Sequence, residues 1–116
     1  GKSAEGVILA NYFHEGVYDW ERSKIFFELW SRNFFPKSPD VYAANAYDAV
    51  WMIAAAVRKV GADRYDIMRW LRNSKWKGAS GFIKVGPDRL EKNFVLQEWK
   101  NGELVLIDRD IVQLSE

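Results

Sequence analysis

The side chains that could bind a ligand gather near the start of one predicted helix. At about 100° per residue, Val41, Tyr42, Asn45 and Asp48 fall on one arc of that helix. They form a polar and aromatic patch, here called the window, on an otherwise apolar helix. A tyrosine that lines a cleft uses both the face of its ring and its hydroxyl. We therefore expect function at this window.

The chain offers little for catalysis. Its single histidine, His14, is expected in a loop or at the surface. Asp108 and Asp110 lie close in sequence, but a carboxylate pair without further ligands is usually solvated. The sequence contains no HExxH motif, phosphate-binding loop or nucleophile elbow. We expect no catalytic residue, no metal site and no cofactor.

Length and composition predict one globular segment. The chain has 116 residues, 48% of them hydrophobic and 16% aromatic, which is enough for a modest core. A net charge of +1 requires no nucleic-acid partner, and none is expected. The absence of cysteine excludes disulfides and thiolate sites. Because it begins GKSAEG without an initiator Met or a signal-peptide pattern, we expect a fragment of a longer protein.

The window belongs to Ser38–Gly61, the stretch around which the rest of the chain is expected to fold. Ser38 is the predicted cap, Pro39 suits the first helical position, and Gly61 suits the residue just past the end. Ala49–Val57 is apolar without a break, so we expect this helix to be covered on nearly every side. The run is too short to span a bilayer.

Other helices and strands are predicted on either side of this stretch. The helices are Trp20–Asn33, capped by Asp19, and Arg64–Arg72, for which Asp63 and Asp66 form a capping box. The strands are Gly6–Phe13, expected to be buried, Gly81–Val85, Phe94–Lys100 and Glu103–Asp108. The last two flank Asn101-Gly102, the strongest short signal for a hairpin.

Motifs in the same order as in one family appear along the chain. Ala46-Tyr47-Asp48-Ala49-Val50, followed by an apolar helix that ends Lys59-Val60-Gly61, resembles the type I periplasmic solute-binding proteins. Within that family it is most similar to the Leu/Ile/Val-binding proteins that feed branched-chain amino-acid ABC transporters. Ala4-Glu5-Gly6, the F-x-G-x-x-G-x-I-x-F-like segment Trp76–Val85 and the hairpin Phe94–Leu106 also match. The resemblance covers nearly all of this chain but only about the last third of a family member.

The resemblance implies a partial type I fold of the α/β class. It would contain one N-terminal strand, three helices, and then a C-terminal strand and a β-hairpin. Family members clamp a ligand between two lobes. By analogy, helices at about 19–73 would belong to one lobe, and strands at about 6–13 and 81–108 to the other. Within the single segment 1–116, the chain would cross between lobes near Ala10–Phe13 and Gly78–Phe82.

The same resemblance suggests which residues contact the ligand. Tyr42 matches a position where the family often places an aromatic contact, and Tyr12 falls in the first expected crossing. Asn45 departs from the small or hydroxyl residue common at its position, which leaves the ligand class open. Tyr42, Asn45 and Tyr12 are our candidate ligand-binding residues, whereas Tyr47 and Asp48 match a signature that we interpret as mainly structural.

Two functions remain open on sequence alone. The first is non-enzymatic capture of an amino acid or similar molecule by a periplasmic or extracellular protein, through hinge closure, for a permease or a sensor. Its uncovered strand edges and apolar patches would favour a homo-oligomer of this segment. The second is an independent module whose aromatic surface binds a protein or a sugar.

Overall fold

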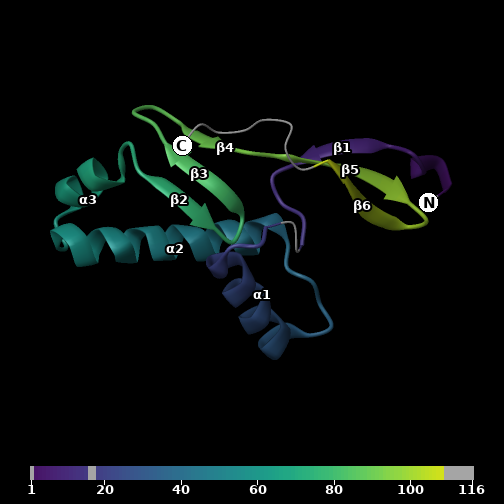
Figure 1. The fold of residues 1–116 in the computed structure, drawn as a ribbon, viewed down its shortest axis with the longest axis horizontal. Helices are drawn as coiled ribbons and strands as arrows, with labels where there is room; N and C mark the ends of the chain where they lie inside the picture. The colour runs from purple at the N-terminus through teal and green to yellow at the C-terminus, as the bar shows by residue number, and fades with distance from the viewer. Residues whose placement is uncertain (1, 16–17, 109–116) are drawn as a thin grey trace.

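The structure is a computed structural model that describes residues 2–15 and 18–108 (Figure 1). Its elements are the 3-10 turn η1 (Lys2–Ala4), β1 (Ile8–Asn11), α1 (Glu21–Phe34), α2 (Val41–Val60), α3 (Arg64–Leu71), β2 (Lys75–Gly78), β3 (Gly81–Val85), β4 (Leu90–Lys92), β5 (Val95–Lys100) and β6 (Glu103–Asp108). This order confirms the predicted α/β class, with one N-terminal strand, three helices and a terminal hairpin. The short strands β2 and β4 were not among the predicted strands.

The strands form two antiparallel sheets, ordered β1-β5-β6 and β2-β3-β4. The hairpin prediction is confirmed, because Asn101 and Gly102 have φ of 53° and 80° and join β5 to β6. The chain does not change sheets at the expected crossing near Gly78–Phe82. Gly78 pairs with Gly81 across a two-residue turn, so β3 folds straight back onto β2. The chain passes to the other sheet only after Lys92, between β4 and β5 (Figure 1).

The helix ends are set by local hydrogen bonds that partly differ from the predicted caps. Asp40, not Ser38, caps α2, because its carboxylate accepts a hydrogen bond from the Ala43 amide at 2.9 Å. Gly61 ends that helix as predicted, with φ of 86°.

Of the other two helices, only α3 begins with a capping side chain. Asp19 does not cap α1. Trp20 holds the cap position instead, and its indole Nε1 donates to the Gly78 carbonyl at 2.7 Å. Asp63 caps α3 as predicted, while Asp66 pairs with Arg69 and so does not close the capping box.

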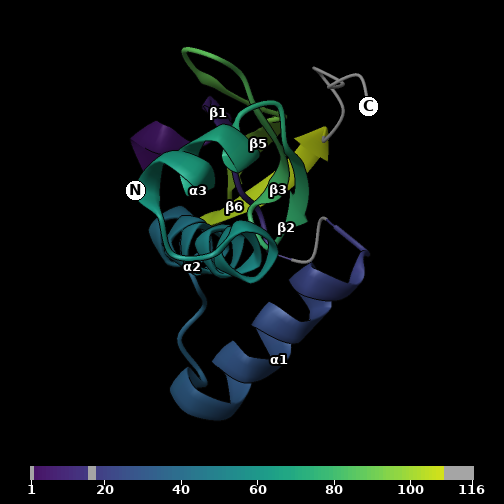
Figure 2. The ribbon, with the colours of Figure 1, turned by 90° about the vertical axis from the view of Figure 1, so that its left-hand side faces the viewer.

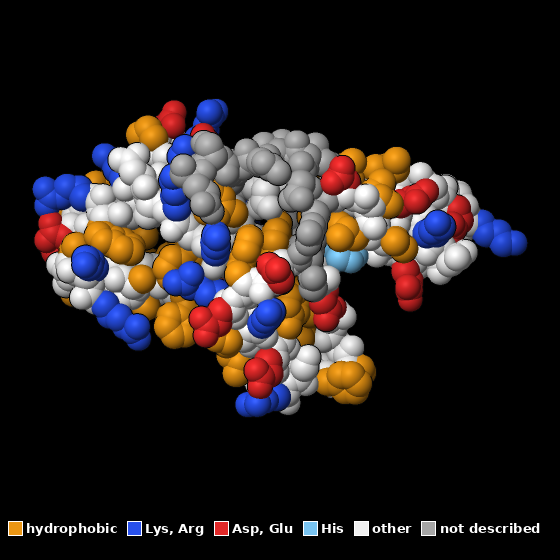
Figure 3. Space-filling model, viewed as in Figure 1, with side chains coloured by type: hydrophobic (Ala, Val, Ile, Leu, Met, Phe, Trp, Pro, Cys, Tyr) orange, Lys and Arg blue, Asp and Glu red, His pale blue; other side chains and the backbone are white. Residues whose placement is uncertain are grey.

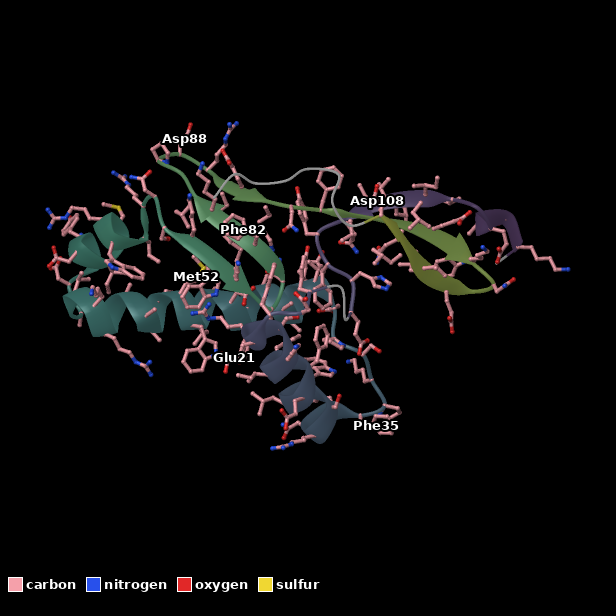
Figure 4. All side chains as sticks on the ribbon, viewed as in Figure 1. Glu21, Phe35, Met52, Phe82, Asp88 and Asp108 are labelled. Atoms are coloured by element: carbon pink, nitrogen blue, oxygen red, sulfur yellow. The ribbon has the colours of Figure 1, made fainter. Side chains whose placement is uncertain are left out.

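The central helix α2 is covered on one side only, which corrects the expectation that it is buried all round. Met52 is 9% exposed and lies on the side that faces β2 (Figure 4). The opposite side, here called the apolar α2 face, consists of Val50, Trp51, Ile53 and Val57 and is exposed. Hydrophobic side chains gather on the surface over α2 and α1 (Figure 3), and α1 lies to one side of α2 (Figure 2). Ala49–Val57 is apolar all round, but the described residues supply cover for only part of it.

Strand β1 departs from its prediction for the same reason. Ile8 and Leu9, expected in a buried strand, are 58% and 41% exposed. β1 pairs only with β5, and no described element packs across that sheet as a second layer. No helix among the described residues is long and apolar enough to cross a membrane. The buried hydrophobic residues include two small clusters, one around Phe13, Phe26, Ala44 and Ala79 and the other around Tyr18 and Val95.

A buried carboxylate fastens the β2–β3 turn to α2. Asp48 is 1% exposed, and its oxygens accept from the Ala79 amide at 2.7 Å, the Ser80 amide at 2.8 Å and the Ser80 hydroxyl at 2.6 Å. Hydrogen bonds of this kind offset the cost of burying the charge. A Cβ on Gly78 would overlap the Asp48 carboxylate. Glycine at position 78 is therefore required by the close approach of the turn to the helix.

We expect Gly78→Ala to destabilise the protein by about 2 to 4 kcal/mol, because the new methyl group must displace a carboxylate that three donors hold. Urea denaturation measures this loss. In an Asp48→Ala background the overlapping carboxylate is absent, so the same substitution should cost much less. An equal cost in both backgrounds would show that the overlap is not with Asp48.

Candidate ligand-binding site

Lys92, at the end of β4, connects three elements that the chain order keeps apart. Its Nζ donates to Asn45 Oδ1 on α2 at 2.6 Å and to the Ser80 Oγ in the β2–β3 turn at 2.8 Å. Because the Ser80 hydroxyl accepts this bond, its own proton is the one given to Asp48. A directed chain thus runs from an ammonium group through a hydroxyl to a buried carboxylate.

Two of the three predicted ligand-binding residues lie around this ammonium group. Asn45 accepts a hydrogen bond from it, and the ring of Tyr12 has its centroid 5.9 Å from Lys92 Nζ. That distance is at the outer limit of a cation–π contact. Tyr12 is 54% exposed, so part of its ring remains available to a ligand. The structure therefore brings together side chains from the segment after β1, from α2 and from β4.

The rest of the predicted window divides between surface and core. Tyr42 is 79% exposed on the first turn of α2, and its ligand contact stays a prediction. Val41 packs against the core cluster and Asp48 is buried, so neither faces solvent in the way the arc indicated. The arc crosses the boundary between the exposed and covered sides of the helix, which periodicity alone does not locate.

Burial makes the Lys92 charge sensitive to its surroundings. The pKa of the Lys92 ammonium is lowered by desolvation, and the negative charge of Asp48 opposes this shift. Asp48 itself does not contact the ammonium group directly, since its hydrogen bonds go to Ala79 and Ser80. The ammonium charge is therefore partly removed from water, and the Asp48 carboxylate balances it only through the intervening Ser80 hydroxyl.

Sequence reasoning missed Lys92. It follows the Gly86-Pro87-Asp88 turn in a short polar stretch with no periodicity, and it lies 47 residues from Asn45. Ser80 falls within the family-like segment Trp76–Val85, but the sequence assigns it no role. Only the pairing of β4 with β3, which places Lys92 opposite Ile83, brings this side chain to the turn.

A second polar cluster links the end of β1 to β5. The Asn11 Oδ1 accepts from the Tyr12 amide at 2.8 Å, which leaves Asn11 Nδ2 to donate to Gln97 Oε1 at 3.2 Å. The Gln97 Nε2 then points to His14 Nδ1 at 2.8 Å, so His14 is the acceptor and is neutral in this arrangement. Gln97 is 3% exposed, so the bridge is shielded from water.

These clusters contain no metal-binding group. Within residues 2–15 and 18–108, no three His, Cys, Asp or Glu side chains are placed to hold a metal ion. Asp110, the partner of Asp108 in the sequence-based carboxylate pair, lies outside the described residues.

The His14 bridge predicts a pH dependence of stability. Burial lowers the His14 pKa below its usual value of 6.5, with a smaller opposing effect from Glu15. The unfolded chain therefore binds the proton more tightly than the folded chain. The contribution of His14 to the free energy of unfolding is complete above about pH 6.5 and is lost as the pH drops through the folded-state pKa. Thermal melts between about pH 7.5 and 5 should show this fall.

His14→Gln should flatten the change over that range. NMR of the imidazole gives an independent reading, because the chain has a single histidine whose resonances need no assignment. A His14 pKa at or above 6.5 in the folded protein would contradict the buried, accepting imidazole.

Comparisons with known proteins identify the family and the fold. The family described as the receptor family ligand binding region matches residues 11–101. No curated protein is significantly similar in sequence. Among solved structures, a leucine-binding protein of Thermotoga maritima is 28% identical with a TM-score of 0.77, and the alignment covers 92% of this chain and 31% of that one.

Two further structures extend the likeness. A substrate-binding protein from Desulfitobacterium hafniense, solved in complex with Leu, is 28% identical with a TM-score of 0.74, over 91% of this chain and 32% of that one. A solute-binding protein from R. palustris, solved with benzoate, is 22% identical with a TM-score of 0.76, over 94% and 31%. It shares the fold. The chain spans about a third of the length of these structures and belongs to the receptor ligand-binding family, with the partial fold of the periplasmic substrate-binding proteins of ABC transporters.

Proposed function

We propose that this chain is part of an extracytoplasmic solute-binding protein that captures an amino acid or a similar small acid between two lobes. The protein would then deliver its ligand to a membrane permease or a sensor, without catalysis. Family membership supports this proposal. So do the two similar structures at 28% identity, since one is a leucine-binding protein and the other was solved in complex with Leu.

The proposal rests on one observation: Tyr12 and Asn45 both lie beside the Lys92 ammonium group. Tyr12 lies in the segment that leaves the β1-β5-β6 sheet, and Lys92 lies just before the chain returns to that sheet through β5. Residues at such passages move relative to each other when two lobes close. A ligand held there would make its contacts with both lobes only in the closed state, and so would favour closure.

The apolar α2 face gives the proposal a second part. A hollow of about 160 Å³ lies beside it, lined by Arg22, Ile25, Tyr47 and Trp51. Val50 and Ile53 are 67% and 51% exposed nearby. Apolar patches of this kind are covered in stable proteins. We propose that in this 116-residue chain a second copy provides the cover in a homo-oligomer. The same surface is what would serve an independent interaction module, the alternative function.

Binding can be tested in the complete protein that contains this segment. We expect calorimetry with leucine, isoleucine and benzoate to detect at least one ligand. Tyr42→Ala should weaken binding of that ligand by about 1 to 3 kcal/mol through loss of an aromatic contact. Since Tyr42 is 79% exposed, the melting temperature should change little.

Tyr65→Ala on α3, which removes a 56% exposed tyrosine far along the chain, is the matched control and should leave affinity unchanged. If Tyr42→Ala lowers stability and leaves affinity intact, Tyr42 is a packing residue. If no panel member binds, the proposed function itself is wrong.

Association of the 116-residue chain has its own test. Light scattering at micromolar concentration should report an oligomer, and Ile53→Lys should convert it to a monomer by placing a charge on the apolar α2 face. Leu90→Lys, at a 62% exposed position on β4, is the control and should not change the mass. A monomeric, cooperatively melting wild-type chain would argue against the oligomer and for an independent module.

A further inference from the structure

The Lys92 ammonium group has bonding capacity that the fold does not use. An ammonium group has three N–H donors. Two of them go to Asn45 Oδ1 and Ser80 Oγ, and the structure gives Lys92 no further hydrogen-bond acceptor among the described residues. The side chain is half-buried, and the exposed ring of Tyr12 has its centroid 5.9 Å from the ammonium nitrogen. One donor on a partly desolvated cation is thus left for an additional acceptor.

The orientation of Asn45 supplies a second donor next to the first. The Asn45 Oδ1 accepts the hydrogen bond from Lys92. The Nδ2 of the same amide therefore has two N–H groups that do not take part in this bond. Asn45 is exposed, which leaves this amide group open to a ligand. An aspartate or leucine at this position would not present a donor beside the ammonium group. Asparagine is the side chain that both accepts from Lys92 and donates outward.

Charge balance favours an anion at this place. Asp48 is the nearest carboxylate in the network, but its oxygens are occupied by Ala79 and Ser80 donors and do not touch Nζ. A charge that is partly removed from water is best stabilised by a directly bonded opposite charge. One N–H from Lys92 and one from Asn45 match the two oxygens of a carboxylate. A phosphate, with more oxygens and a higher charge, would need further donors that the described residues do not place here.

We infer that Lys92 and Asn45 form a carboxylate-binding subsite, in which the Lys92 ammonium and the Asn45 Nδ2 each donate to one ligand oxygen while Tyr12 borders the bound group. The inference rests on the proposed function and specifies the ligand class, a small carboxylic acid in its ionised form. Lys92 would thereby make selection depend on charge, whereas the apolar and aromatic neighbours would contribute to shape.

Titration of the complete protein with leucine, benzoate and benzamide tests the subsite. The carboxylate that binds the wild type should lose about tenfold or more in affinity in Lys92→Met, which keeps the apolar stem but removes the charge. Lys92→Arg should retain most of the affinity. Lys84→Met is the matched control, because it removes a half-buried lysine from the neighbouring strand β3 and should have no effect. Benzamide, the neutral amide analogue of benzoate, should bind weakly to every variant.

A second variant keeps the test decisive if Lys92→Met folds poorly. Asn45→Asp still accepts from Lys92 but replaces the outward donor with a negative charge, so it should fold and lose about tenfold or more in carboxylate affinity. Wild-type binding that is unchanged in both Lys92→Met and Asn45→Asp would overturn the subsite and leave the proposed function standing. Tight wild-type binding of benzamide with no binding of benzoate or leucine would also overturn it. A wild type that binds none of the three compounds would contradict both.

Discussion

The structure depends on one buried carboxylate. Asp48 lies on α2 with 1% exposure and binds the backbone and hydroxyl of the β2–β3 turn. This contact fixes the turn to the helix beside the small hydrophobic cluster in which Ala79 of the turn packs with Ala44 of α2. The same contact sets the direction of the Ser80 hydroxyl, which in turn fixes Lys92, and Lys92 fixes the amide of Asn45. Removing Asp48 would leave buried donors unpaired. This would destabilise the fold and loosen the candidate site.

The parts of the fold that depend on short sequence signals were predictable. Gly61 marks the end of α2 because only a left-handed residue fits there, and Asn101-Gly102 marks the hairpin because both residues adopt positive φ. The capping of α2 was displaced from Ser38 to Asp40, since a carboxylate beside the helix start is the better acceptor. Such signals act over a few residues and need no knowledge of the tertiary structure.

The parts that depend on long-range contacts were not predictable. The window on α2 identified Asn45 but not its partner Lys92, because β4 reaches the helix only after β3 has folded back on β2. The same turn moved the passage between sheets to the end of β4. Exposure of Val50 and Ile53 was also missed, because an apolar run indicates what a helix needs for cover and not what is present to cover it.

Polar contacts occur at both places where the chain passes between the sheets. Lys92 lies at one passage and contacts Asn45 and Ser80, while Gln97 near the other contacts Asn11 and His14. Such contacts are directional and can be exchanged for contacts to a ligand or to water at modest net cost, in contrast to close-packed cores. The lobe closure that we propose would benefit from this property.

In the proposed site the ligand is held at Lys92 and Asn45, beside the passage of the chain from β4 to β5. Side-chain amide and backbone NMR spectra of the complete protein, recorded during titration with leucine or benzoate, test it most directly. The Asn45 Nδ2 signals and the amides of Tyr12 and Lys92 should shift together and saturate at one ligand concentration. Saturable shifts confined to Trp51 and its neighbours on the apolar α2 face, with the Asn45 signals unmoved, would contradict it.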